Sequence, residues 1–186
     1  GEILAMKGSD HGQSPGGWFI NKNLAGGGAV IYHTGGIFDL MRWFLQKRIK
    51  SVYAEIDTLI HNMKVDDCGL IMLEFENGVF ATIDPSWSRP STFPASGDVT
   101  LEIIGTKGII YIDVYAQTIS VYPMGMKGIL WHGWGSNIEN ELIENFVEMI
   151  QYNRSPEITG EDGFEALKIA DAAYKSSITK KPERIC

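Results

Sequence analysis

One segment, residues 26–45, restricts the possible folds more than any other part of the chain. It reads GGGAVIYHTGGIFDLMRWFL, so three glycines end a polar loop and a long apolar segment follows. Apolar side chains recur there every three or four residues, which predicts an amphipathic helix near residues 29–46. The side chains predicted to face a core are Val30, His33, Ile37, Leu40, Met41 and Phe44.

A neighbouring stripe of the same predicted helix carries Tyr32, Gly36, Asp39 and Trp43. Gly35 and Gly36 each cost about 1 kcal/mol relative to alanine inside a helix. This cost indicates a need for empty volume or for close backbone approach, and a ligand cavity beside Tyr32 would supply that need. Alternatively, the two glycines kink the helix, or the helix begins only after Gly36.

Segments typical of β-strands, joined by short turns, fill much of the remaining chain. One predicted hairpin flanks Asn77-Gly78, the dipeptide preferred in a two-residue type I′ turn, and a second flanks Thr106-Lys107. So many strands with short connections predict an α+β fold with one large, mostly antiparallel open sheet. The predicted strands are Glu2–Gly8, Ser51–Ile60, Cys68–Glu76, Val79–Asp84, Val99–Gly105, Gly108–Asp113 and Thr118–Tyr122.

Two more helices are predicted near residues 137–153 and 160–179. Ser136 and Glu139 fit a capping box for the first, and Glu161 and Asp162 favour the N-terminus of the second. The second helix is predicted to bury a stripe made of Phe164, Leu167, Ala170, Tyr174 and Ile178. The three helices can cover one face of the sheet, but several strands are apolar on both faces. We therefore expect the other face to stack on a second copy, in a homodimer or homotetramer.

Charge and composition argue against several functional classes. The 186 residues carry a net charge of −7 without a long basic stripe, so no nucleic-acid partner is expected. No run of 18 apolar residues is present, so no membrane partner is expected. Cys68 and Cys186 lack the spacing of a metal site, so no metal is expected, and a reducing cytoplasm is the expected location.

Two aromatic segments are candidates for ligand contact. Residues 9–23 are predicted to form a glycine-rich loop that carries the candidate recognition residues Asp10, His11, Trp18 and Phe19. Alternatively, Trp18 and Phe19 pack over the core as a lid. Residues 124–135 carry Trp131, His132 and Trp134 and are predicted to be irregular. This second segment either closes over a ligand or neighbouring subunit, or fills the domain's own core.

The order of several motifs resembles a known family. Gly26, Gly27, Gly28 and Ala29, followed by Asp39, Arg42 and Trp43, match the pattern GGGAL-x-D-x-x-x-H-x-x-D-x-x-RW, and HGQSPGGWF, GTKG and TGEDGFEAL also match. Together they resemble the C-terminal domain of the glucose-fructose oxidoreductase / inositol dehydrogenase / MocA family. The resemblance implies an NAD(P)-dependent oxidoreductase that acts on a sugar, a polyol or a related hydroxyl compound.

The resemblance also implies that cofactor binding and substrate binding belong to two different domains. Family members bind NAD or NADP mainly through an N-terminal Rossmann domain, which also carries a catalytic lysine in an E-K-P motif. No G-x-G-x-x-G follows a strand in this sequence, and no E-K-P is present. We therefore expect residues 1–186 to be a single C-terminal domain for substrate binding and oligomerisation, without cofactor-binding residues of its own.

The sequence departs from the family pattern at the D-x-x-x-H pair, which takes part in proton transfer in the family. The matching positions hold Tyr32 and Gly36, and neither can act as an ordinary acid or base near neutral pH. His33 is close to the same helix surface and is the expected catalytic residue, unless it is a hydrogen-bonded structural histidine. The expected substrate-binding residues are His11, Trp18, Tyr32, Gly36 and Asp39.

Two alternatives to an ordinary dehydrogenase remain open at this point. Loss of the Asp/His pair favours a non-catalytic sugar-binding or scaffold relative. A family variant with other redox-coupled chemistry, such as glycoside cleavage, could instead use His33.

Overall fold

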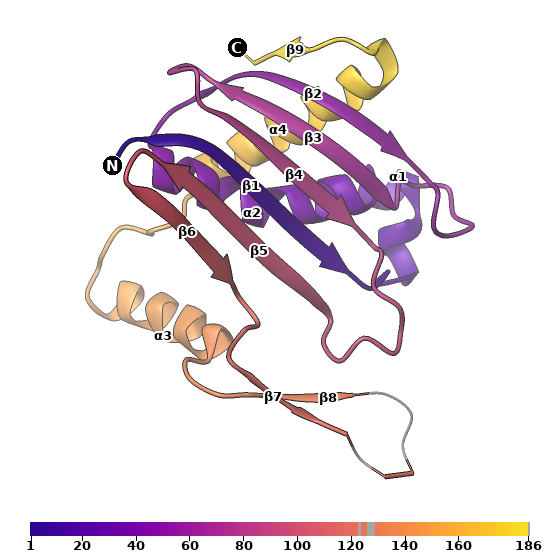
Figure 1. The fold of residues 1–186 in the computed structure, drawn as a ribbon, viewed down its shortest axis with the longest axis vertical. Helices are drawn as coiled ribbons and strands as arrows, with labels where there is room; N and C mark the ends of the chain where they lie inside the picture. The colour runs from indigo at the N-terminus through magenta and orange to yellow at the C-terminus, as the bar shows by residue number, and fades with distance from the viewer. Residues whose placement is uncertain (123, 126–128, 186) are drawn as a thin grey trace.

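The computed structural model describes residues 1–122, 124–125 and 129–185, so Cys186 lies outside the described residues. Its main body is a seven-stranded open sheet in the order β6-β5-β1-β4-β3-β2-β9 (Figure 1). Only the β1–β4 pair is parallel within this sheet, which confirms the predicted mostly antiparallel α+β fold. The strands are β1 Ile3–Gly12, β2 Ile49–Asp57, β3 Cys68–Phe75, β4 Phe80–Ser86, β5 Gly97–Gly105, β6 Gly108–Asp113 and β9 Glu183–Arg184.

Strand β1 continues to Gly12, so the prediction of a loop from Ser9 onward is wrong for its first residues. The polar residues can stay in the strand because β1 lies between two partners. Ser9 pairs with Asp84 of β4 and with Thr100 of β5, and its hydroxyl lies 2.6 Å from that of Thr100. Alternating side chains of β1 then point to opposite faces, so Asp10 faces the helices with Met6 and His11 faces away.

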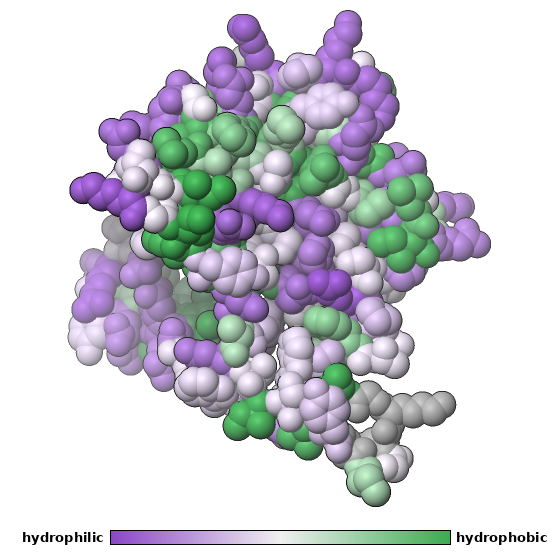
Figure 2. All heavy atoms as spheres, in the orientation of Figure 1, coloured by the Kyte–Doolittle hydropathy of each residue, from purple (hydrophilic) through white to green (hydrophobic). Residues whose placement is uncertain are grey.

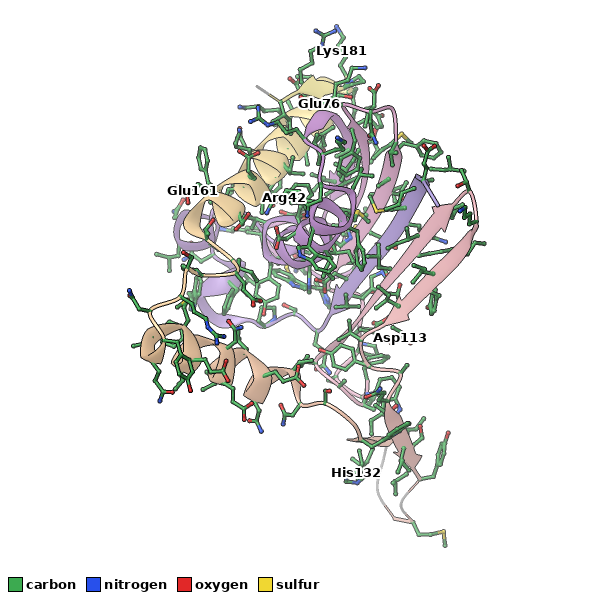
Figure 3. All side chains as sticks on the ribbon, turned by 90° about the vertical axis from the view of Figure 1, so that its left-hand side faces the viewer. Arg42, Glu76, Asp113, His132, Glu161 and Lys181 are labelled. Atoms are coloured by element: carbon green, nitrogen blue, oxygen red, sulfur yellow. The ribbon has the colours of Figure 1, made fainter. Side chains whose placement is uncertain are left out.

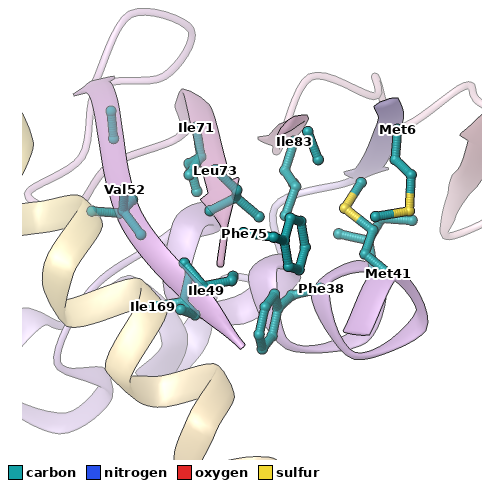
Figure 4. Close-up of a cluster of buried hydrophobic side chains, with 14 of the residues drawn as sticks. Met6, Phe38, Met41, Ile49, Val52, Ile71, Leu73, Phe75, Ile83 and Ile169 are labelled. Carbon is teal, nitrogen blue, oxygen red and sulfur yellow. The ribbon is translucent and has the colours of Figure 1, made fainter. Parts of the chain in front are cut away.

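Helices α2, Ala29–Leu45, and α4, Gly160–Thr179, cover one face of the sheet (Figures 1 and 3). Between helices and sheet lies the core, whose larger members include Met6, Phe38, Met41, Ile71, Leu73, Phe75, Ile83 and Ile169 (Figure 4). Helix α2 runs without interruption through Gly35 and Gly36, so a helix start after Gly36 is excluded. Phe38 is buried in place of the predicted Leu40, which is partly exposed.

The prediction for the buried stripe of α4 is largely wrong. Its start is as expected, since Thr159 and Asp162 form a capping box, but Phe164, Leu167 and Ile178 are exposed. The buried side is made of Ile169, Ala170, Ala172, Ala173 and Ser176. Small side chains let α4 approach β2 closely, and the Ser176 hydroxyl accepts the Ala54 N–H at 3.1 Å. Close packing against the sheet therefore outweighs the burial of larger side chains here.

The β3–β4 hairpin exists as predicted, but its turn type is different. The Phe75 N–H donates to the Val79 carbonyl at 2.8 Å, and the Gly78 N–H donates to the Phe75 carbonyl at 2.9 Å. Gly78 has a φ of 84°, whereas Asn77 does not adopt a positive φ. A three-residue loop with glycine in the left-handed region replaces the predicted type I′ turn.

Several segments lie outside this main body. β7, Thr118–Val121, was expected in the large sheet but pairs with β8, Leu130–Gly133, in a separate two-stranded ribbon (Figure 1). Helix α3, Ile138–Gln151, is capped by Asn137 and not by the predicted Ser136, because the Asn137 side chain accepts two backbone N–H groups. No residue of α3 is buried, and no described helix is long and apolar enough to cross a membrane.

The sheet face opposite the helices is rich in exposed apolar side chains. By strand register, this face carries residues that alternate with the core residues of the same strands. Figure 2 looks onto it and shows hydrophobic groups with hydrophilic ones between them. Five of its large side chains are each more than half exposed, namely Leu70, Met72, Phe80, Ile109 and Tyr111.

Candidate functional site

The glycine turn before α2 is filled by protein and not open to a ligand. Asp66 accepts the N–H groups of Gly28 and Val30, each at 2.8 Å, and the Tyr174 hydroxyl at 2.7 Å. A Cβ on Gly28 would come within 1.9 Å of the Asp66 carbonyl oxygen. Burial, and then the nearby Asp66 charge, raise the pKa of Tyr174. The N–H groups that could bind a dinucleotide phosphate therefore already bind a carboxylate, so this turn does not fit that role.

A pocket of about 570 Å³ opens at the end of β1, beside the first turns of α2 and the start of β5. Short helices η1, Gly17–Ile20, and α1, Lys22–Ala25, follow β1 before the chain enters α2. The pocket is lined chiefly by polar groups and glycines, including Asp10, His11, Tyr32, His33, Gly36 and Asp98. The structure thus brings four of the six predicted site residues to one pocket.

Asp10 and His33 form an ion pair or charge-assisted hydrogen bond within this pocket. The His33 Nδ1 lies 2.7 Å from the Asp10 Oδ1, and His33 is only 6% exposed. Its Nε2 is buried and has no hydrogen-bond partner among the described residues. The ring packs against Gly12, because a Cβ there would come within 2.9 Å of the ring carbon Cε1. The His33 ring is thus held by the contact with Asp10 and by packing against Gly12.

Gly36 leaves an open volume next to the Asp10 carboxylate. A Cβ built on Gly36 would meet only the Asp10 Oδ2 within 4 Å, at a distance of 3.9 Å. The volume vacated by the family histidine therefore borders the Asp10 carboxylate. The sequence pattern placed Asp10 only among the polar residues of a predicted loop and not among the expected substrate-binding residues, whereas strand alternation aims its side chain at α2.

An aromatic row leads from the surface to His33. Trp18 stacks on Phe19 with ring centroids 3.9 Å apart, Phe19 meets Tyr32 edge-on at 5.4 Å, and Tyr32 meets His33 edge-on at 4.9 Å. Tyr32 also borders a second pocket of about 160 Å³, which Trp18 and Trp87 line. Trp18 therefore lies at the outer end of this row. It lines the second pocket, whereas Asp10 lines the main pocket.

His11 lines the main pocket, but its ring belongs to a cluster of charges. Its Nε2 lies 3.2 Å from the Asp84 carboxylate, and its Nδ1 lies 2.9 Å from the Arg89 guanidinium and 3.6 Å from Asp98. The hydrogen bond with Asp84 is the main cause that raises the pKa of His11, against the opposing effect of burial. This ring is therefore held by protein groups on every polar atom.

Asp39 lies outside the pocket. One turn beyond Gly36, its carboxylate accepts the Arg42 side chain at 3.0 Å, and Arg42 also pairs with Asp162 at the start of α4. The structure thus gives Asp39 a role in holding α2 against α4. Among the described residues, no group of His, Cys, Asp and Glu is arranged to hold a metal ion, and Cys68 is a free cysteine.

The chain resembles known proteins in sequence. The profile of the GFO/IDH/MocA C-terminal domain matches residues 1–111. The uncharacterized oxidoreductase YrbE of Bacillus subtilis strain 168 is 31% identical over 150 residues, which is 75% of this chain and 42% of the relative. The myo-inositol 2-dehydrogenase of Thermotoga maritima is 26% identical over 171 residues, which is 86% of this chain and 49% of the relative. The chain spans about half the length of the curated relatives it matches.

A solved structure gives the same fold. The crystal structure of GenD2 from gentamicin A biosynthesis, in complex with NAD, matches with a TM-score of 0.87 and 24% sequence identity. That match covers 100% of this chain and 56% of GenD2. The profile match extends over more than half of the chain, and the predicted resemblance is therefore confirmed. The chain belongs to the GFO/IDH/MocA family and corresponds to its C-terminal domain.

Proposed function

We propose that this chain is the substrate-binding domain of an NAD(P)-dependent oxidoreductase that acts on a sugar, a polyol or a related hydroxyl compound. The observation that carries the proposal is the polar pocket at the end of β1, with the Asp10–His33 pair beside the vacated position of Gly36. A carboxylate and an imidazole in a pocket of this size can bind and orient a small polyhydroxy compound. The Thermotoga maritima relative is a myo-inositol 2-dehydrogenase, which supports a substrate of this class.

NAD or NADP is the proposed cofactor, and we place its main binding site in a nucleotide-binding domain outside this chain. When bound, the nicotinamide would supply the hydride acceptor or donor. Occupation of the α2 N-terminus by Asp66 supports this placement, because no free phosphate site remains at the glycine turn. The NAD in the GenD2 structure supports a cofactor of the same type.

We further propose that two copies stack through the open sheet face, as a homodimer or as half of a homotetramer. Leu70, Met72, Phe80, Ile109 and Tyr111 support this, because exposed apolar areas beyond a few hundred Å² are rare on monomers. A cytoplasmic location is proposed as well, and the free Cys68 is consistent with a reducing compartment.

The pocket assignment is tested in the full-length protein by reduction of NAD and NADP with a panel of sugars and polyols. Gly36→Leu would fill the space beside Asp10, so we expect the KM of the preferred substrate to rise at least about tenfold. Gly35→Leu is the matched control, because a Cβ at Gly35 meets nothing within 4 Å and Gly35 is not among the lining residues. Equal kinetics for wild type and Gly36→Leu would show that the substrate binds elsewhere.

A second candidate is a sugar-binding or scaffold relative without catalytic activity. The specific observation that favours it is the replacement of the family's Asp/His pair by Tyr32 and Gly36. The same panel separates the two functions. Sugar binding in calorimetry without any turnover of NAD or NADP would support the second candidate and refute the first.

A further inference from the structure

We propose that Asp10, and not His33, is the group that contacts the reacting hydroxyl of the substrate, and that His33 is a positioning residue behind it. This inference rests on the proposed function of the pocket, but it assigns roles that the family pattern does not supply. Four observations carry it. They are the contacts of the two Asp10 carboxylate oxygens, the burial of His33, the space at Gly36, and the pairing of the other charged side chains of the pocket with protein groups.

The two oxygens of Asp10 are in different situations. Oδ1 lies 2.7 Å from the His33 Nδ1, whereas the hydrogen bonds and ion pairs of the described residues include none to Oδ2. The Asp10 side chain is 16% exposed and lines the pocket. Oδ2 is also the one atom that faces the open volume at Gly36. A carboxylate oxygen that lines a pocket and accepts no protein donor can accept a hydrogen bond from a ligand, so a substrate hydroxyl is a suitable partner for it.

His33 is poorly placed to touch substrate itself. Its Nδ1 is engaged by Asp10, and its Nε2 is buried beside the Gly12 backbone. A substrate atom could reach Nε2 only if Gly12 or the ring moved. The imidazole can instead fix the rotamer of Asp10 through the Nδ1–Oδ1 contact, in the same way that a carboxylate commonly orients a histidine.

The other charged groups around the pocket already have partners. Asp98 accepts the Arg89 guanidinium on both oxygens, at 2.5 and 2.8 Å, and the His11 ring is held by Asp84 and Arg89. Tyr32 borders the pocket with a half-exposed ring and presents a phenol in place of a carboxylate. Among the described residues that line the pocket, the Asp10 Oδ2 is therefore the carboxylate oxygen that can accept a hydrogen bond from a substrate hydroxyl.

The proposed role conserves atoms and charge. Bound NAD(P) would supply the hydride acceptor. Asp10 Oδ2 would take the hydroxyl proton as the substrate carbon loses its hydride and the C–O bond becomes a carbonyl. In the reverse direction Asp10 returns the proton to the forming alcohol oxygen. General acid–base assistance of this kind contributes roughly 10²- to 10⁴-fold in rate.

The test compares Asp10→Asn and His33→Gln in the full-length protein, with Asp171→Asn on the exposed side of α4 as the control. Asp10→Asn keeps an acceptor for the His33 Nδ1 but cannot take a proton, so we expect kcat to fall at least about 100-fold. His33→Gln should reduce kcat by about tenfold, because the carboxylate remains. Melting temperature and dinucleotide affinity should match those of wild type in both variants.

Chemical rescue separates a catalytic carboxylate from a structural one. Added formate should restore part of the rate of Asp10→Ala and none of the rate of His33→Gln, because only the first variant lacks a carboxylate at the reacting hydroxyl. The inference is overturned if His33→Gln loses more activity than Asp10→Asn, or if Asp10→Asn keeps the wild-type rate.

The proposed function can fail separately from this inference. If wild type binds a sugar but turns over no dinucleotide, the oxidoreductase function fails for that protein, and the inference then concerns the hydroxyl contact alone. In that case Asp10→Asn should weaken sugar affinity in calorimetry at least about tenfold, and unchanged affinity would overturn the inference. Absence of both turnover and sugar binding in wild type would overturn it as well.

Discussion

Asp66 should be a major determinant of stability, although it lies outside every motif identified in the sequence. Its carboxylate accepts three donors: the N–H groups of Gly28 and Val30, and the Tyr174 hydroxyl. Asp66 thereby caps α2 and ties that helix to α4. Asp66→Asn is the informative change, because an amide oxygen in the Oδ1 position keeps two of these three hydrogen bonds.

The cost of Asp66→Asn can be worked out from these contacts. The new amide NH₂ would face the Val30 N–H, so one buried donor loses its partner at a cost of about 1–3 kcal/mol. Loss of a negative charge at the helix N-terminus costs roughly another 0.3–1 kcal/mol. We therefore expect the free energy of unfolding to fall by about 1.3–4 kcal/mol. Tyr174→Phe removes the hydrogen bond donated to Asp66 and a longer one, 3.3 Å, accepted from the Gly28 N–H, which Asp66 still accepts; it should cost about 1 kcal/mol.

Urea denaturation of the purified protein, followed by tryptophan fluorescence, measures both changes. Trp87 is a suitable reporter because it is buried against Ala29, next to the capped end of α2. Asp171→Asn is the control, since its pair with Lys175 is exposed and should contribute at most about 0.5 kcal/mol. A loss below 1 kcal/mol for Asp66→Asn would refute the reasoning, because the Val30 N–H would then have found another acceptor.

Three further predictions follow from the structure. Gly35→Ala should raise the free energy of unfolding by about 0.5–1 kcal/mol in urea titrations, because a Cβ there meets nothing within 4 Å; a lower stability would indicate strain in α2. His11 has a raised pKa, so its stabilising effect is present below the unfolded pKa of about 6.5 and is lost as pH rises through the folded value. The free energy of unfolding should accordingly fall less with rising pH for His11→Gln than for wild type. The same pH dependence in both proteins would contradict this. Met72→Lys on the open sheet face should convert the oligomer to monomer in light scattering, whereas Trp131→Lys in the β7–β8 ribbon should not; a monomeric wild type would exclude the interface.

Much of the fold could be predicted because its signals are local. The helical spacing after Gly28, the turn residues near Gly78, and the acidic first turn after Thr159 each act within a few positions of the chain. The predicted bounds of α2 and of the two hairpins therefore lie close to those observed. Predictions failed where contacts between distant parts of the chain determine the structure. The buried side of α4 is set by the packing of its small residues against β2, and β7 pairs with β8 and not with the large sheet.

The candidate site likewise has features that could be predicted from the sequence and features that could not. The sequence by itself determined the family, the pocket-facing side of α2, and the loss of the Asp/His pair at Tyr32 and Gly36. Only the tertiary structure decided which groups lie beside the vacated position, because Asp10 reaches His33 through the order of strands in the sheet and the pleat of β1. Asp66 and Tyr174 likewise meet although they are 108 residues apart. No local pattern encodes such pairs, since each residue's neighbour in space is set by the packing of α2 and α4 on the sheet.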